Sequence, residues 1–87
     1  MQFYRELGSR LRVARERADL SQQALGDRVG LTRTSISNIE GGRQRILAHT
    51  LQELAFAVGM RSADLLPDGT AAEEWIEAIK GKGRGAL

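Results

Sequence analysis

Two short amphipathic segments, residues 22–29 and 33–40, lie only three residues apart and constrain the fold of this chain more than any other feature. In both, apolar residues recur at helical spacing, so each segment is predicted to be a helix with one inward face. Ser21 and Thr32 precede the two segments and can accept the free amides of a helix start. Gly30 follows the first segment, where a helix end favours a residue that tolerates positive φ.

The remaining periodicity predicts helices over residues 3–18, 48–58 and 62–66, with no strand pattern between them. The helix over 48–58 is predicted from an apolar stripe at helical spacing, made of Leu47, Leu51, Leu54, Ala55 and Val58. These segments predict an all-α fold, with one domain over residues 1–68.

A C-terminal extension, residues 69–87, follows the turn-forming sequence Pro67-Asp68-Gly69. Residues 71–80 are expected to form one more short helix, because acids lie in its first turn, Lys80 in its last, and Trp75, Ile76 and Ile79 make a narrow apolar edge. The glycine-rich residues 81–87 are expected to be a disordered basic tail.

Composition excludes several classes of protein. A chain of 87 residues without cysteine and with a single histidine, His49, offers no thiolate metal site and no triad with a spare base. We therefore expect no enzyme, no catalytic residue, no metal and no cofactor. The longest apolar run, residues 54–60, is too short to span a bilayer. The N-terminus carries charged residues where a signal peptide would have its apolar core. We therefore expect a cytoplasmic protein without a membrane partner.

The charge is unevenly divided along the chain. Residues 1–45 hold nine arginines against five acids, a balance of +4, whereas residues 46–87 hold four basic groups against six acids, a balance of −2. A basic half suggests an anionic partner for that half. The alternative is codon bias, since eleven of the thirteen basic residues are arginine.

The outer face of the segment 33–40 carries four side chains that can bond base edges: Arg33, Thr34, Ser37 and Asn38. Arginine pairs bidentately with guanine, asparagine with adenine, and hydroxyls with either. A helix that is buried on one side and carries short polar side chains on the other can enter the major groove of DNA. The competing interpretation is a solvated helix face.

The sequences Leu20-Ser21-Gln22-Gln23-Ala24-Leu25, Val29-Gly30-Leu31-Thr32 and Ser35-Ile36-Ser37-Asn38-Ile39-Glu40-Gly41-Gly42-Arg43 resemble the helix-turn-helix of the Cro/phage-repressor (Xre-like) family. The resemblance extends from about Leu7 to Leu66. It implies a five-helix, lambda-repressor-like domain that binds double-stranded DNA.

The resemblance also implies roles for individual residues. Gln22 matches a position that contacts phosphate, and Arg15 and Glu40 match a partly buried salt bridge that joins the first and third helices. Gly26 stands where the family usually has alanine, at a cost of about 0.5–1 kcal/mol in helix propensity. Ile46-Leu47 replaces the usual Pro-Ser entrance of the fourth helix, so that helix lacks a capping hydroxyl. The full set of expected phosphate contacts is Gln22, Gln23, Thr32, Ser35, Arg43 and Arg45.

The predicted function is a transcriptional regulator, most simply a repressor, that acts as a homodimer on a pseudo-palindromic operator. The alternative is an antitoxin or similar module that holds a partner protein, such as a toxin or another regulator, through its C-terminal segment. The edge at Trp75 either folds back onto its own core or forms a dimer seam. The predicted dimer interface comprises Val58, Met60, Leu65, Leu66, Trp75, Ile76 and Ile79.

Overall fold

The computed structural model describes residues 2–67, and within that range every regular element is a helix. The expected helix over 71–80, the expected tail 81–87 and the side chains of Trp75, Ile76 and Ile79 lie outside the described residues. The all-α, five-helix architecture is confirmed. Its elements are α1 (Gln2–Arg17), α2 (Gln22–Val29), α3 (Arg33–Glu40), α4 (Ala48–Ala57) and α5 (Ser62–Leu65).

Local signals set the ends of α2 and α3 where the sequence predicts them. The Ser21 hydroxyl accepts the amide of Ala24 at 3.0 Å, and the Thr32 hydroxyl accepts the amide of Ser35 at 3.0 Å. Gly30 has a φ of 72°, which allows the chain to leave α2 in a left-handed turn and enter α3 three residues later, at Arg33. The two helices are thus joined by a tight turn that fixes their mutual orientation.

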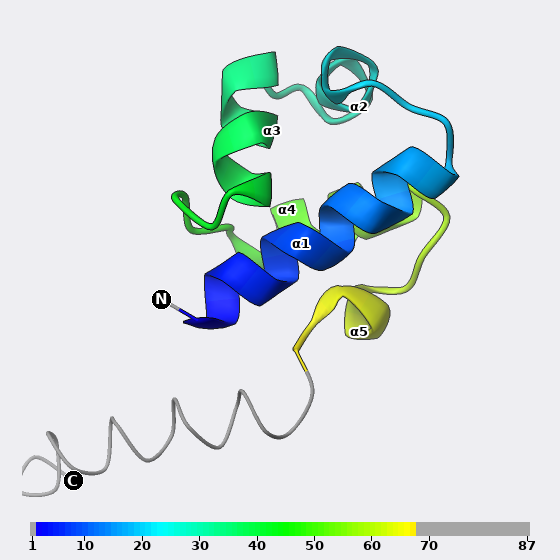
Figure 1. Ribbon diagram of the computed structural model, residues 1–87. Helices are drawn as coiled ribbons and strands as arrows, with labels where there is room; N and C mark the ends of the chain where they lie inside the picture. Colours follow the sequence, from blue (N-terminus) through cyan, green and yellow to red (C-terminus); the bar gives the residue numbers. More distant parts are fainter. Residues whose placement is uncertain (1, 68–87) are drawn as a thin grey trace, which may run out of the picture.

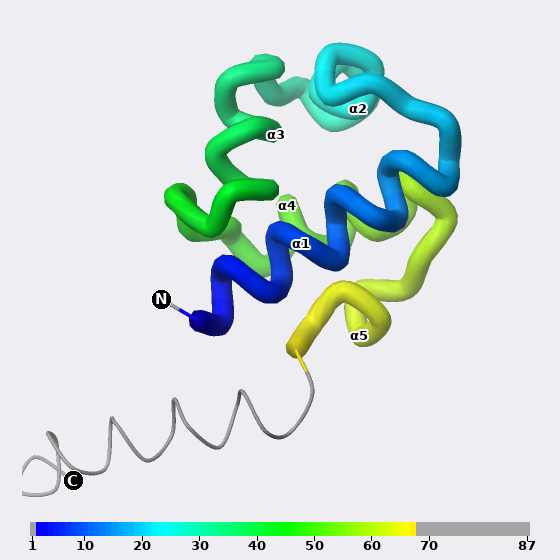
Figure 2. The backbone as a smooth tube through the Cα atoms, viewed as in Figure 1, coloured from blue at the N-terminus to red at the C-terminus, as the bar shows by residue number. Residues whose placement is uncertain are grey.

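The helices surround one core, with α1 crossing in front of α4 and α5 lying beside α1 (Figure 1). The tube view shows α2 and α3 together at the end of the domain opposite α5 (Figure 2). Helix α3 packs against both α2 and α1, and α4 packs against α2 and α5. Six side chains are almost completely buried at the centre: Leu11, Leu25, Ile36, Ile39, Leu54 and Leu65.

Two glycines allow the backbones to approach closely. A Cβ atom on Gly8 would overlap the carbonyl oxygens of Ile39 and Glu40, so α1 contacts the end of α3 only because this position lacks a side chain. A Cβ atom on Gly26 would likewise overlap the carbonyl oxygen of Leu31. The sequence-based interpretation of Gly26 as a tolerated and slightly costly replacement for alanine is therefore corrected: alanine does not fit here without a backbone shift.

The start of α4 also differs in detail from expectation. Leu47 is the N-cap residue and makes no side-chain cap bond, as the missing Pro-Ser predicted. Its side chain is 68% exposed, however, so it does not belong to the buried stripe of this helix. None of the helices among residues 2–67 combines the length and apolar character that crossing a membrane requires.

Candidate nucleic-acid interface

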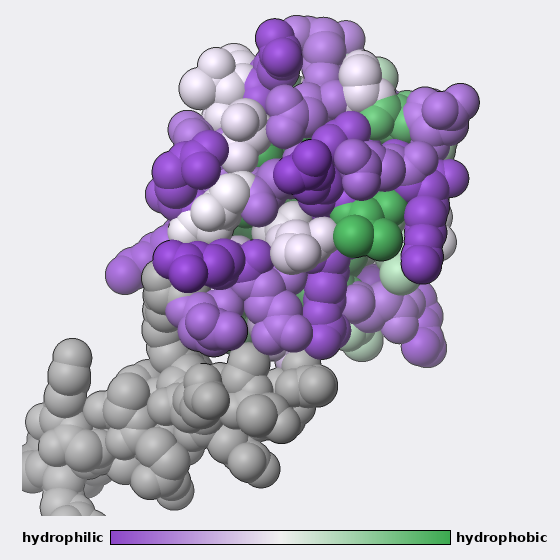
Figure 3. Space-filling model, in the orientation of Figure 1, coloured by the Kyte–Doolittle hydropathy of each residue, from purple (hydrophilic) through white to green (hydrophobic). Residues whose placement is uncertain are grey.

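Helix α3 presents its polar residues outward because its isoleucines point into the core. Ile36 and Ile39 are buried, whereas Arg33 and Thr34 are exposed and Ser37 and Asn38 are half-buried. The face that the sequence assigned to base edges is thus accessible along the length of α3. In the view of Figure 3, where α1 crosses in front of α4, the surface is mostly hydrophilic.

A small hollow at the surface brings residues of α2 and α3 together. It has a volume of about 190 Å³ and is lined by Gln22, Arg33, Thr34 and Ser37. A larger shallow depression next to it extends to Arg12 and Arg15 of α1 and includes Ser21, Gln22, Gln23 and Arg33. Two predicted phosphate contacts, Gln22 and Gln23, and three predicted base contacts therefore share one continuous surface.

An ion pair supports this surface from below. The Arg15 guanidinium donates to both carboxylate oxygens of Glu40, at 2.6 and 3.1 Å, and also to the carbonyl of Leu20 at 2.7 Å. The side chains of Arg15 and Glu40 are only 10% and 4% exposed. The hydrogen bond to Glu40 raises the pKa of Arg15 above its ordinary value, so the Arg15 guanidinium stays charged at neutral pH.

Gln22 belongs to the same network. Its side-chain amide donates to Glu40 Oε1 at 3.1 Å, which holds the side chain in place at the first position of α2. An amide nitrogen carries two hydrogens, so one N–H remains for an acceptor outside the protein. A phosphate oxygen is such an acceptor, and Glu40 thus acts as a positioning residue for the first polar group of α2.

Asn38 and Arg43 contact each other, which the sequence did not reveal. Arg43 Nε donates to Asn38 Oδ1 at 3.2 Å, and the guanidinium also donates to the carbonyl of Ser37 at 3.2 Å. Arg43 thereby covers the carboxyl end of α3 while remaining exposed. Asn38 is a predicted base contact and Arg43 a predicted phosphate contact. Their side chains are therefore already joined by a hydrogen bond in the protein without DNA.

The other predicted contacts are exposed or partly exposed. Within residues 2–67, the guanidinium groups of Arg33 and Arg45 have no hydrogen-bond or ion-pair partner, so both can receive an anion. Thr32 is exposed and uses its oxygen as the cap of α3, which leaves its O–H as a donor. Gln23 is exposed and donates to Asp27 at 3.0 Å, and Ser35 is half-buried.

The residues expected at a dimer interface divide into three groups. Val58 and Leu65 are 7% and 0% exposed and belong to the core of the single chain. Met60 and Leu66 are each 37% exposed. The other three, from the C-terminal segment, lie outside the described residues.

Phe56 is an apolar surface residue that the sequence reasoning missed. It is 87% exposed, the largest value among the large hydrophobic residues that the structure describes. It lies on α4 beside Arg28 and Glu53, at a shallow hollow between α2 and α4. The signal was present in the sequence, since Phe56 falls outside the apolar stripe of its helix.

Comparison with known proteins supports a helix-turn-helix assignment. A family model described as a helix-turn-helix domain matches residues 6–68. The restriction-modification controller protein C.AhdI from Aeromonas hydrophila is 28% identical, with a TM-score of 0.69 over 72% of this chain and 96% of that chain. The DNA-binding domain of the P22 c2 repressor is 27% identical, with a TM-score of 0.67 over 71% of this chain and 82% of that chain.

The same fold also occurs within an enzyme. Hydroxypropylphosphonic acid epoxidase from S. wedmorenis is 21% identical, with a TM-score of 0.71 over 75% of this chain but only 35% of that chain. At this identity the likeness shows the fold alone. No match was found among curated protein sequences.

Proposed function

The chain belongs to the helix-turn-helix family, of the Cro/phage-repressor (Xre-like) type, and on that premise we propose that it is a sequence-specific repressor of transcription. In this proposal α3 enters the major groove of double-stranded DNA and Arg33, Thr34, Ser37 and Asn38 read base edges. The observation that carries the proposal is the continuous polar surface that joins Gln22 of α2 to the outer face of α3.

Phosphate contacts fix the position of α3 on the duplex. Gln22, Gln23, Thr32 and Ser35 lie at or near the amino ends of α2 and α3, where free amides and the helix dipole favour an anion. Arg43 and Arg45 lie just after the other end of α3. Contacts at both ends of the recognition helix would hold its register along the groove, while its middle reads sequence.

We propose further that two copies bind together, on two half-sites about 34–36 Å apart, one turn of duplex. Phe56 is the best-supported centre for the contact between copies. An aromatic side chain gains most from burial against another apolar group. In a two-fold contact each surface meets its own copy, so Arg28 of one copy can face Glu53 of the other.

We propose a cytoplasmic location, where the protein would meet its DNA. The alternative, a module that mainly holds a partner protein, makes a different prediction about DNA. Selection of bound duplexes from a random pool, at moderate salt, separates the two. The proposal predicts one enriched pseudo-palindromic sequence; a pool without enrichment at a salt concentration where binding persists would contradict it.

A further inference from the structure

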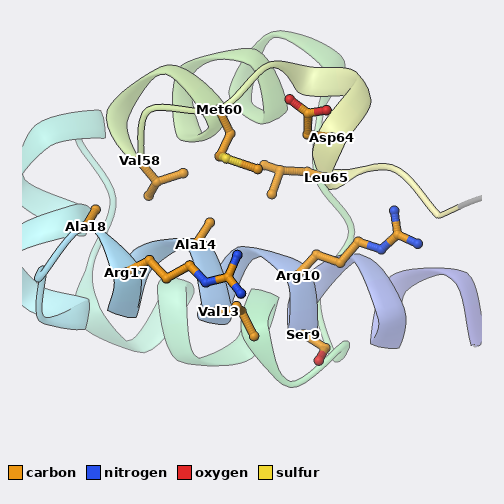
Figure 4. Close-up of a pocket in the computed structure, with 10 residues that line it drawn as sticks. All are labelled: Ser9, Arg10, Val13, Ala14, Arg17, Ala18, Val58, Met60, Asp64 and Leu65. Carbon is orange, nitrogen blue, oxygen red and sulfur yellow. The ribbon is translucent and has the colours of Figure 1, made fainter.

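A groove between α1 and α5 leaves part of the core uncovered. It has a volume of about 430 Å³, and its apolar lining comprises Val13, Ala14, Ala18, Val58, Met60 and Leu65. Figure 4 shows Val58, Met60 and Leu65 on one side of the groove and Ala14 of α1 on the other. Val13 and Met60 are 43% and 37% exposed, so the groove presents apolar surface to water.

The described chain ends beside this groove. The guanidinium of Arg10, which lines the groove, donates to the carbonyl of Leu66, and Pro67 is buried. The sequence continues as Asp68-Gly69-Thr70 and then as residues 71–80. Proline, aspartate and glycine in this order favour a reversal of the chain, and loops of two to five residues commonly join antiparallel helices.

The sequence of residues 71–80 predicts a short helix with one apolar edge, which suits the apolar lining of the groove. We propose that they form a helix that packs into the groove of their own chain, with Trp75, Ile76 and Ile79 against the apolar lining. A helix of ten residues is about 15 Å long, and α1 rises about 10 Å between Arg10 and its last residue, Arg17. A tether of three residues reaches at most about 10 Å, so it keeps the segment close to the groove of the same chain.

The charges that line the groove favour residues 71–80 as its occupant. Arg10 and Arg17 line the groove from α1, while residues 71–80 hold three acids and one lysine, a balance of −2. The acidic group on the α5 side, Asp64, is already paired with Arg61 at 3.4 Å. Hydrogen bonds from Arg61 lower the pKa of Asp64, which keeps this carboxylate in the form that pairs with Arg61. Arg10 is likewise paired with Glu6 at 3.3 Å, so among the described residues Arg17 is the lining cation that remains for an acidic segment.

This inference assigns the apolar edge to the chain's own core and leaves contact between copies to other surfaces. It goes beyond DNA recognition and does not depend on it. It also describes how a small domain could bury more apolar surface: a tryptophan side chain alone can remove about 150–250 Å² from water.

Trp75 is the only tryptophan of the chain, so its fluorescence reports the segment without a label. In the full chain we expect blue-shifted emission and weak quenching by acrylamide, both independent of protein concentration. Val13→Glu should shift the emission to the red and increase quenching, while the helical circular dichroism is retained. Leu47→Glu is the matched control, because it changes another exposed aliphatic residue outside the groove, and it should leave the emission unchanged.

Each other result overturns the inference. Red-shifted, readily quenched emission in the unaltered chain would mean that Trp75 is solvated. A blue shift that disappears on dilution would place the segment on a second copy. A blue shift that survives Val13→Glu and a second groove variant, Met60→Glu, would place Trp75 against another surface.

Discussion

The ion pair between Arg15 and Glu40 has a double role, because Glu40 holds both the first helix and Gln22. Removing one partner of a buried pair leaves the other charge without compensation, which costs far more than the net value of the pair. The pair therefore connects the stability of the domain to the position of Gln22, a proposed phosphate contact. The resemblance implied this pair, but only the structure reveals the hydrogen bond to Gln22.

We predict that Glu40→Gln lowers the free energy of unfolding by about 3–5 kcal/mol, measured by denaturant titration. Glu16→Gln is the matched control, since it breaks the Arg12–Glu16 pair, whose side chains are 65% and 55% exposed. That change should cost about 0–1 kcal/mol. Equal losses in the two variants would show that Arg15–Glu40 is no more important than a surface pair.

Arg43 illustrates a contact that sequence patterns cannot supply. Its position after α3 predicts a phosphate contact, but its hydrogen bond to Asn38 depends on the rotamers of an exposed and a half-buried side chain. Nothing in residue spacing encodes those rotamers. The proposed base contact of Asn38 and the proposed phosphate contact of Arg43 are therefore less independent than the sequence suggests.

Arg43→Ala should weaken binding to all duplexes and reduce the dependence of log affinity on log salt concentration by about one unit. Fluorescence anisotropy at several salt concentrations measures both effects. Arg61→Ala removes an exposed arginine that is paired with Asp64 on the α5 side, and it should leave the slope unchanged. A slope that does not change in Arg43→Ala would remove Arg43 from the phosphate contacts.

At the scale of the elements, the boundaries of α2 and α3 follow from their sequences. Each has a hydroxyl cap, and Gly30 provides the left-handed end that α2 needs. The distance at which two helices pack does not follow from their own sequences, because it depends on residues that meet only in the folded chain. Gly26 is an example: helix propensity favours alanine, whereas the carbonyl of Leu31 leaves no room for it.

Gly26→Ala is accordingly predicted to destabilise the domain by about 1–3 kcal/mol, despite its better helix propensity. Gly41→Ala is the control, since the added methyl group would meet only the flexible end of the Arg43 side chain. Thermal and denaturant unfolding of the two variants measure the difference. Stabilisation by Gly26→Ala would mean that propensity, and not the approach of Leu31, governs this position.

For the whole molecule, the sequence predicted the fold but not the distribution of apolar surface. Periodicity placed Leu47 in the core, yet it is the N-cap residue just before α4 and is exposed. Val58 and Leu65 were expected between copies, but they complete the core of one chain. Phe56 is exposed instead, because α4 turns this side chain away from the core. Which apolar side chains remain exposed for contact between copies therefore depends on how the helices pack, and not on the apolar pattern of any single helix.

If Phe56 is the centre of the contact between copies, Phe56→Ser should shift the population towards monomers and weaken operator binding. Sedimentation equilibrium and operator titration measure the two effects. Ala63→Ser, a similarly exposed change on α5, should alter neither. A dimer of unchanged stability in Phe56→Ser would move the contact to another surface.

We propose that the outer face of α3 reads the DNA sequence. The most direct measurement is the ratio of affinities for the selected operator and for a random duplex, at one salt concentration, in the unaltered chain and in Arg33→Ala. We predict that Arg33→Ala loses about 1–3 kcal/mol on the operator, relaxes the preference at one base pair and barely changes binding to random DNA. Equal losses on both duplexes would contradict the claim, because Arg33 would then contact only the backbone.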